Sequence, residues 1–126
     1  MKKDINSLSE IEIDACPFQI TLSVIEGKWK FFIIYTLMLN GTLRFKELER
    51  AIGSITPRML IKELKDLEAN GIVRRKAFAT VPPTVEYNLT EMGMTLEPII
   101  SAMSEWGKKL KELNKASAHI PKALVG

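Results

Sequence analysis

TPRMLIKELKDLEANG, residues 56–71, begins and ends like a helix. Thr56 can cap the helix with its hydroxyl, and Pro57 suits the first helical position because its missing N–H leaves no bond unmade. The pair Asn70-Gly71 tolerates the left-handed dihedrals of a helix stop. The sequence therefore predicts a helix between these two ends.

The two faces of this predicted helix differ in chemistry. At about 100° per residue, leucines fall on one stripe and basic residues fall nearly opposite. The leucines are Leu60, Leu64 and Leu67, and the basic residues are Arg58, Lys62 and Lys65. Folding requires the apolar stripe but not a basic row, and duplex DNA is the commonest partner with regularly spaced negative charge. The stretch is predicted to be a recognition helix; the alternative is an ordinary solvated face.

The residues before this stretch predict a partner helix. Residues 44–52 place Phe45, Leu48 and Ile52 on one face, and residues 53–55 form a turn that contains glycine. A short helix, a tight turn and a second helix with a basic outer face make a helix-turn-helix pattern, in which the first helix braces the second in the major groove.

The residues after the stretch change to a two-residue period. Residues 72–78 and 84–89 are strand-like, and residues 79–83 join them with two prolines that cannot donate to a ladder. Such a hairpin predicts a wing beside the recognition helix. A hairpin that only covers the core is the alternative, and the two readings are compatible.

Helices are also predicted on both sides of this unit. Residues 17–26 read as a short helix with Cys16 just before it, and residues 28–40 are apolar on nearly every side and must be central. Thr90 is predicted to cap a final helix, which Pro98 should bend or split. Its apolar residues follow a heptad seam that favours packing against a second copy of the chain. They are Met92, Leu96, Ile99, Met103, Trp106, Leu110 and Leu113.

Size and charge limit the architecture. The 126 residues, of which 46% are hydrophobic, are enough for one domain. We expect a flexible arm at 1–14, a single domain at 15–113 that includes the C-terminal dimerisation helix, and a tail at 114–126. Residues 41–81 hold nine basic and five acidic side chains, a surplus of four positive charges, whereas residues 1–26 are acidic.

Composition also argues against several classes of function. Cys16 is the sole cysteine, which fits a reducing cytoplasm, and neither a targeting signal nor a membrane span is evident. The single histidine, His119, falls in the predicted tail. Because no metal-ligand cluster, phosphate loop or nucleophile–base pair can be assembled, we expect no cofactor, no metal and no enzymatic activity.

Several motifs together resemble one family, from about residue 16 to residue 110. They are Cys16-Pro17, Gly27-Lys28-Trp29, Arg44-Phe45-Lys46-Glu47-Leu48, the helix end from Leu60 to Gly71, the proline-rich stretch from Val81 to Gly93, and Trp106-Gly107. In their order and spacing the chain resembles the HxlR-type family of bacterial winged helix-turn-helix transcription regulators. The proline-rich wing is the most specific of these motifs.

The resemblance implies a fold and a function. The expected fold is mainly α with a small β-hairpin (α+β), a winged helix-turn-helix with extra N- and C-terminal dimerisation helices. The expected function is a homodimer that binds a roughly palindromic site near a promoter and regulates the adjacent gene. Some relatives sense oxidants or electrophiles through a cysteine that matches Cys16, and a helix N-terminus can make a thiol more reactive. A small apolar cysteine without a sensing role is the alternative.

These expectations assign roles to residues. The groove-facing residues would be Thr56, Pro57, Arg58, Met59 and Lys62, with Arg58 best suited to a bidentate contact with guanine. Phosphate contacts would come from Arg44, Lys46, Ser54, Lys65, Arg75, Lys76 and Thr80. The dimer interface would include Ile20, Leu96, Ile99, Met103, Trp106 and Leu110.

Two other possibilities remain open from the sequence. A dimer with Trp29, Phe32 and Trp106 near its interface could enclose an apolar pocket for a small-molecule effector, although plain core packing explains these aromatics too. The winged helix could also be a protein-interaction module whose basic face meets an acidic protein instead of DNA.

Overall fold

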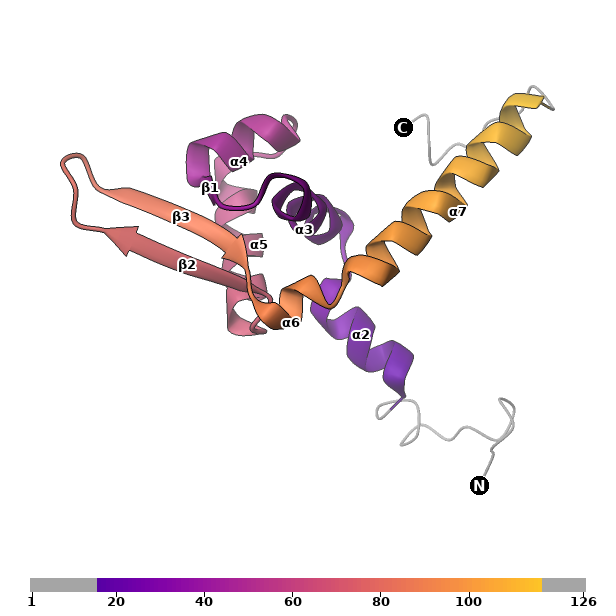
Figure 1. Ribbon diagram of the computed structural model, residues 1–126, viewed down its shortest axis with the longest axis horizontal. Helices are drawn as coiled ribbons and strands as arrows, with labels where there is room; N and C mark the ends of the chain where they lie inside the picture. Colours follow the sequence, from indigo (N-terminus) through magenta and orange to yellow (C-terminus); the bar gives the residue numbers. More distant parts are fainter. Residues whose placement is uncertain (1–15, 117–126) are drawn as a thin grey trace.

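The computed structural model describes residues 16–116, which form a group of helices and a small sheet that extends from it (Figure 1). Residues 1–15 and 117–126, which include the expected N-terminal arm and His119, lie outside the described residues. The helices and strands follow one another along the chain as α2 (Pro17–Ile25), α3 (Lys28–Asn40), β1 (Leu43–Arg44), α4 (Phe45–Ile52), α5 (Pro57–Ala69), β2 (Val73–Phe78), β3 (Thr84–Leu89), α6 (Glu91–Met94) and α7 (Glu97–Ala116).

Helix α5 has the predicted ends. The Thr56 side chain accepts a hydrogen bond from the Met59 N–H at 3.1 Å, and Pro57 occupies the first helical position. At the other end, Gly71 adopts φ +74°, a left-handed value that favours glycine. The predicted leucine stripe, Leu60, Leu64 and Leu67, is fully buried. The cap and the stripe together fix which face of α5 points outward.

Helix α3 is central, as its apolar composition predicted. Ile33, Ile34 and Leu37 are buried, and α3 packs against α4, α5 and α7. Helix α4 packs against α3, and its Leu48 is fully buried in the same core as the leucines of α5. The two helices of the helix-turn-helix therefore rest on one common core, which holds α5 in a fixed orientation.

The sheet has one strand more than the predicted hairpin. Its order is β1-β3-β2, with all neighbours antiparallel. The added strand is β1, in which Leu43 pairs with Tyr87 and Arg44 pairs with Glu86. The hairpin β2–β3 extends away from the helices as the wing (Figure 1). Strand β1 ties the base of this wing to the start of α4.

The helix predicted after Thr90 is split, which is one of the two outcomes expected at Pro98, and the chain breaks between α6 and α7. The Thr90 side chain caps the short helix α6 by accepting from the Gly93 N–H at 3.0 Å, and α7 begins at Glu97. Pro98 is the second residue of α7, where its missing N–H needs no partner, whereas inside a continuous helix its ring would meet the carbonyl one turn before. The proline thus splits the helix, and the apolar seam is not continuous.

Helices α2 and α7 project from the body on the side opposite the wing (Figure 1). Helix α7 continues through Ala116, so residues 114–116, expected to belong to the tail, form its last turn. Within residues 16–116, no helix has the length and apolar character needed to cross a membrane. The wing and α5 therefore lie at one end of the molecule and the two projecting helices at the other.

Candidate nucleic-acid interface

The outer face of α5 carries the residues that were predicted to face a groove. Thr56, Pro57, Arg58, Met59 and Lys62 are all exposed, and so is Lys65. Burial of the leucine stripe forces these side chains to the solvent side of the helix. The N-terminal half of α5 thus presents a row of exposed basic and small side chains on a helix whose opposite face is locked into the core.

A second basic surface lies between the start of α4 and the wing. A groove of about 480 Å³ there is lined by Arg44 and Lys46 from the helix side and by Pro82 and Pro83 from the wing tip. Arg50 also lines this groove. Arg50 was given no role from the sequence, because only the folded position of the wing shows that it lies beside this groove. The expected contributors Ser54 and Thr80 are likewise exposed, in the turn and at the wing tip.

The pleat of β2 separates two residues that were predicted to work together. Arg75 lines a groove of about 500 Å³ between α5 and the sheet, together with Lys65 and Tyr87. Lys76 lines a different groove on the outer face of the sheet, with Arg74. Successive strand residues point to opposite faces. Arg75 therefore lies on the same side of the wing as α5, and Lys76 does not.

One residue of the basic row on α5, Lys62, forms ion pairs with carboxylates of the same helix. Lys62 Nζ lies 3.4 Å from Glu63 Oε1 and 3.6 Å from Asp66 Oδ2. Asp66 is partly exposed, but Glu63 is buried. Its partner is Lys30 of α3, which is buried as well and donates to Glu63 Oε1 at 2.9 Å and to Asp66 Oδ2 at 3.3 Å.

This charge cluster shifts the titration of two of its members. Burial lowers the pKa of Lys30, but the hydrogen bonds to Glu63 and Asp66 outweigh it and hold that pKa above its usual value. The hydrogen bond from Lys30 lowers the pKa of Asp66 below its usual value. Both shifts favour the charged forms. The role of Lys30 as a partner of these carboxylates was not predicted, because Lys30 lies in α3, a helix that was predicted from its apolar residues.

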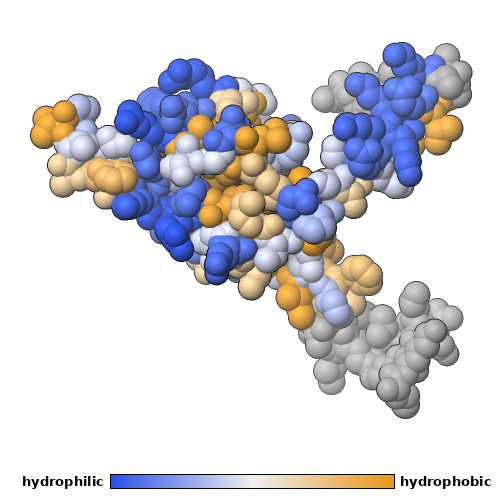
Figure 2. Space-filling model, in the orientation of Figure 1, coloured by the Kyte–Doolittle hydropathy of each residue, from blue (hydrophilic) through white to orange (hydrophobic). Residues whose placement is uncertain are grey.

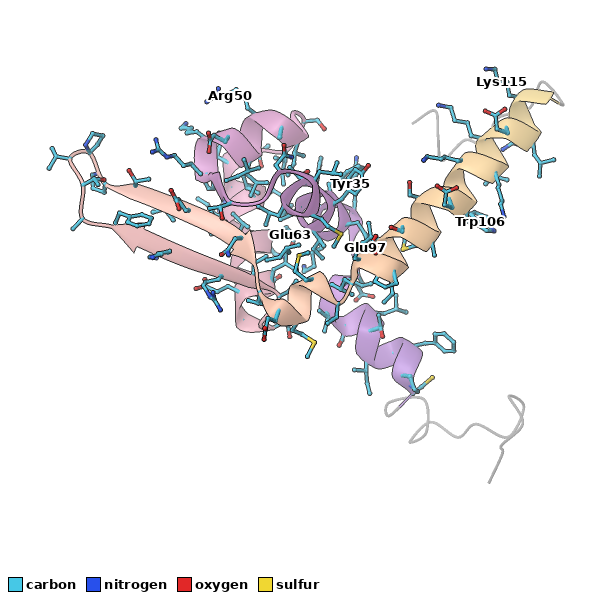
Figure 3. The ribbon with its side chains drawn as sticks, in the orientation of Figure 1. Tyr35, Arg50, Glu63, Glu97, Trp106 and Lys115 are labelled. Atoms are coloured by element: carbon cyan, nitrogen blue, oxygen red, sulfur yellow. The ribbon has the colours of Figure 1, made fainter. Side chains whose placement is uncertain are left out.

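Apolar side chains are exposed at the other end of the molecule. Ile99, Met103 and Trp106 of α7 have exposed fractions of 40%, 48% and 66%, and Figure 3 shows Trp106 standing away from α7. Hydrophobic colour also gathers over α2 in Figure 2, where Ile20 is exposed. Exposed apolar side chains on two projecting helices are typical of an interface between chains.

One of the residues predicted for a dimer interface does not lie on this exposed face. Leu96, which precedes α7, is buried in the core of the subunit because the break before Pro98 turns it inward. Leu110 is half-buried.

The three aromatics proposed to enclose an effector pocket are not together within one subunit. Trp29 and Phe32 are neighbours in α3 with ring centroids 6.0 Å apart. Phe32 lines an apolar groove of about 290 Å³ with Tyr35 and Met103, but neither tryptophan lines that groove.

Cys16, the candidate redox sensor, lies at the start of α2. It is a free, half-buried thiol at the N-cap position, and its side chain makes no capping hydrogen bond. Its backbone carbonyl accepts the first hydrogen bond of the helix, from the Ile20 N–H at 3.0 Å. The thiol therefore lies beside the exposed apolar face of α2, at some distance along the chain from the recognition helix.

Comparison with known proteins identifies the family. The family model described as "HxlR-like helix-turn-helix" matches residues 24–115. The chain is 50% identical over 100 residues to the uncharacterized HTH-type transcriptional regulator YybR of Bacillus subtilis (strain 168). The aligned residues cover 79% of this chain and 79% of YybR. It also resembles the redox regulator HypR, in its reduced form with a TM-score of 0.73 at 49% identity, covering 79% of this chain and 98% of that one.

The oxidized form of HypR matches as well, with a TM-score of 0.69 at 53% identity over 75% of this chain and 96% of that one. The matched family region contains the helix-turn-helix, the wing and nearly all of α7. Together with the capped recognition helix and the basic wing groove, these matches show that the chain belongs to the HxlR-like helix-turn-helix family of DNA-binding transcription regulators.

Proposed function

We propose that this regulator works in the cytoplasm as a homodimer that reads a two-fold symmetric DNA site with its two α5 helices. The observation that carries the proposal is the exposed row of Arg58, Lys62 and Lys65 on a helix whose other face is locked into the core. A rigidly held basic helix beside a basic wing matches the geometry with which winged helix-turn-helix proteins enter the major groove.

Base reading and phosphate contact divide between parts of this surface. We assign the groove to the N-terminal half of α5, where Arg58 can form a bidentate pair with guanine and the exposed Met59 can contact a thymine methyl group. The start of α4, the turn and the wing would hold the DNA backbone. The proposed phosphate contacts are Arg44, Lys46, Ser54, Lys65, Arg75, Lys76 and Thr80, to which we add Arg50 because it lines the same groove as Arg44 and Lys46.

The homodimer is proposed from the exposed apolar surface of α2 and α7. A monomer would leave Phe18, Ile20 and Trp106 in water with exposed fractions of 80%, 55% and 66%. Packing against a second copy removes that cost, and both helices lie at the end opposite the DNA-binding surface. Two recognition helices in such a dimer would meet the duplex about one turn apart, ~34 Å.

A response to oxidants is a second proposal, supported by Cys16 and by the similarity to HypR, which is described as a redox regulator. Cys16 adjoins α2, one of the two helices proposed to form the dimer. A disulfide at this thiol would have to join two subunits or a small thiol, because the chain has one cysteine. A change at this position would alter how α2 packs in the dimer.

The proposed function is tested by selecting DNA fragments from a random pool with the purified protein at stated salt. We expect enrichment of a palindromic sequence, and we expect Arg58→Ala to lose about 1–3 kcal/mol of affinity for it while changing random DNA little. Lys111→Ala, which removes an exposed cation on α7, is the control and should bind as the unaltered chain does. If the pool shows no enrichment, the protein-interaction alternative replaces this proposal.

A further inference from the structure

Helix α5 carries no net charge, although one of its faces is basic. Residues 57–69 contain Arg58, Lys62 and Lys65 against Glu63, Asp66 and Glu68, so three positive charges meet three negative ones. A helix that enters a polyanionic groove is repelled by its own carboxylates unless another group neutralises them. If α5 reads DNA as proposed above, a counter-charge must come from outside the helix.

A counter-charge of this kind comes from α3, on the core side of α5. Lys30 of α3 approaches α5 from the core side and bonds to Glu63 at 2.9 Å and to Asp66 at 3.3 Å. Figure 3 shows Glu63 directed into the body of the molecule, between α5 and α3. The second carboxylate oxygen of Glu63 lies beside Gly27, which is at the N-terminal, positive end of the α3 dipole. A Cβ added at Gly27 would be 3.8 Å from this oxygen. Both carboxylates thus have a cationic partner on the side away from solvent.

Lys62 competes with Lys30 for the same two carboxylates. It reaches them at 3.4 Å and 3.6 Å, but its side chain is 65% exposed, whereas that of Lys30 is 10% exposed. When Lys62 swings toward DNA, Glu63 and Asp66 keep Lys30. Without Lys30, the departure of Lys62 would leave a buried carboxylate unpaired, which is strongly unfavourable.

We infer that Lys30 sets the affinity of this regulator for DNA without touching DNA, by neutralising Glu63 and Asp66 so that Lys62 is free to contact the DNA groove. This inference rests on the proposed function. Lys30 is a positioning residue whose effect passes through Lys62, and it lies outside every surface assigned to DNA above.

A purely structural role for the pair would give a different pattern. If Lys30 and Glu63 only hold α3 against α5, removing either partner weakens DNA binding, because the recognition helix loses its orientation. If charge controls Lys62, the two removals act in opposite directions: loss of the cation weakens binding and loss of the carboxylate strengthens it. The sign of the Glu63 effect therefore separates the two roles.

The experiment measures binding of the full chain to the selected palindrome and to a random duplex by fluorescence anisotropy, between about 50 and 200 mM salt. Lys30→Met should lower affinity roughly fivefold to tenfold near 0.1 M salt on both duplexes and flatten the salt slope by about 0.9, as expected when one cation no longer contacts the DNA. Glu63→Gln should raise affinity on both. The double variant Lys30→Met with Glu63→Gln restores the charge balance and should return close to the unaltered chain.

Lys62→Ala completes the test. In the unaltered chain it should flatten the salt slope by about 0.9, and in the Lys30→Met background it should change the slope very little, because Lys62 is then held by the carboxylates. Equal losses in the two backgrounds would overturn the inference. So would weaker binding by Glu63→Gln or a double variant no better than Lys30→Met.

Folding and the proposed function are kept separate by two further measurements. Thermal unfolding of each variant shows whether Lys30→Met folds; if it does not, Glu63→Gln and Asp66→Asn decide the matter, and each must raise affinity. An unaltered chain that binds neither duplex at low salt overturns the proposed function. An unaltered chain that binds while the variants keep its salt slope overturns this inference alone.

Discussion

Gly93 of α6 lies directly against the backbone carbonyl of Ile72, which precedes β2. A Cβ at Gly93 would overlap that carbonyl and would also press against Leu89 at 3.3 Å. The same carbonyl accepts hydrogen bonds from the backbone N–H of Thr90 at 3.0 Å and from its side chain at 3.2 Å. The contact joins the end of the wing to the turn that follows the recognition helix.

Gly93→Ala should therefore lower the free energy of unfolding by about 1–3 kcal/mol, because the carbonyl cannot move without breaking its bonds to Thr90. The measurement is chemical denaturation. Gly107→Ala is a matched control, since a Cβ at Gly107 in α7 has no neighbour within 4 Å. It should be neutral or stabilising by about 0.5–1 kcal/mol, as expected for alanine in a helix interior.

Trp106→Asp should weaken the proposed homodimer by about 2 kcal/mol or more, because a charge would replace a large apolar side chain at the centre of the exposed α7 face. Sedimentation equilibrium measures this loss directly. Val81→Asp is the control, since Val81 is 99% exposed at the wing tip. Unchanged association of the Trp106 variant would rule out α7 as the dimer interface.

Arg75→Ala should weaken binding to all DNA sequences and flatten the salt slope by about 0.9, because Arg75 lines the groove beside α5. Lys76→Ala removes the same charge from the neighbouring position, on the outer face of the sheet, where Nζ lies 5.1 Å from the centre of the Phe78 ring. Its effect should be smaller. A larger loss for Lys76→Ala would mean that DNA approaches the wing from its outer face.

Oxidation of the unaltered chain should couple Cys16 either to the partner's Cys16 or to an added small thiol. Each coupling removes two hydrogens, which pass to the oxidant. Mass spectrometry under non-reducing conditions should show the covalent dimer or the thiol adduct, and anisotropy should show a changed affinity for DNA. Cys16→Ser should show neither change. A DNA response that survives in Cys16→Ser would exclude this thiol as the sensor.

Asp66 should make the fold sensitive to acid. Its pKa in the folded chain is lowered by the hydrogen bond from Lys30, so its contribution is present above the unfolded pKa and is lost as pH falls through the folded pKa. Between about pH 6 and pH 3 the unaltered chain should therefore lose more stability than Asp66→Asn. Glu112→Gln, on the exposed side of α7, should follow the unaltered chain. Parallel pH curves for Asp66→Asn and the unaltered chain would contradict the role of Lys30 at this carboxylate.

Local signals in the sequence were enough for the recognition helix and its support. The cap at Thr56, the proline at position 57 and the leucine stripe each act within one helical turn, so no distant contact was needed to predict them. Strand β3 was predicted at residues 84–89, where it is found, because its alternation ends at prolines on one side and at a helix cap on the other.

What the sequence could not supply depends on contacts between distant residues. The pairing of Lys30 with Glu63 spans 33 positions, and no local period places a buried lysine opposite a buried carboxylate. Strand geometry could predict that Arg75 and Lys76 point to opposite faces of the sheet. It could not predict which of the two faces would meet α5. Leu96 fitted a seam by its spacing, and the break before Pro98 removed it from that seam.

The neutralising charge beneath α5 has a consequence for chimaeric regulators. Exchanging residues 57–69 alone between relatives would treat the helix as a self-sufficient module. Here that graft would leave Lys30 behind and separate Glu63 and Asp66 from the cation that pairs with them. The transferable unit is thus α5 together with α3, and a graft of α5 alone would understate how strongly the helix binds DNA.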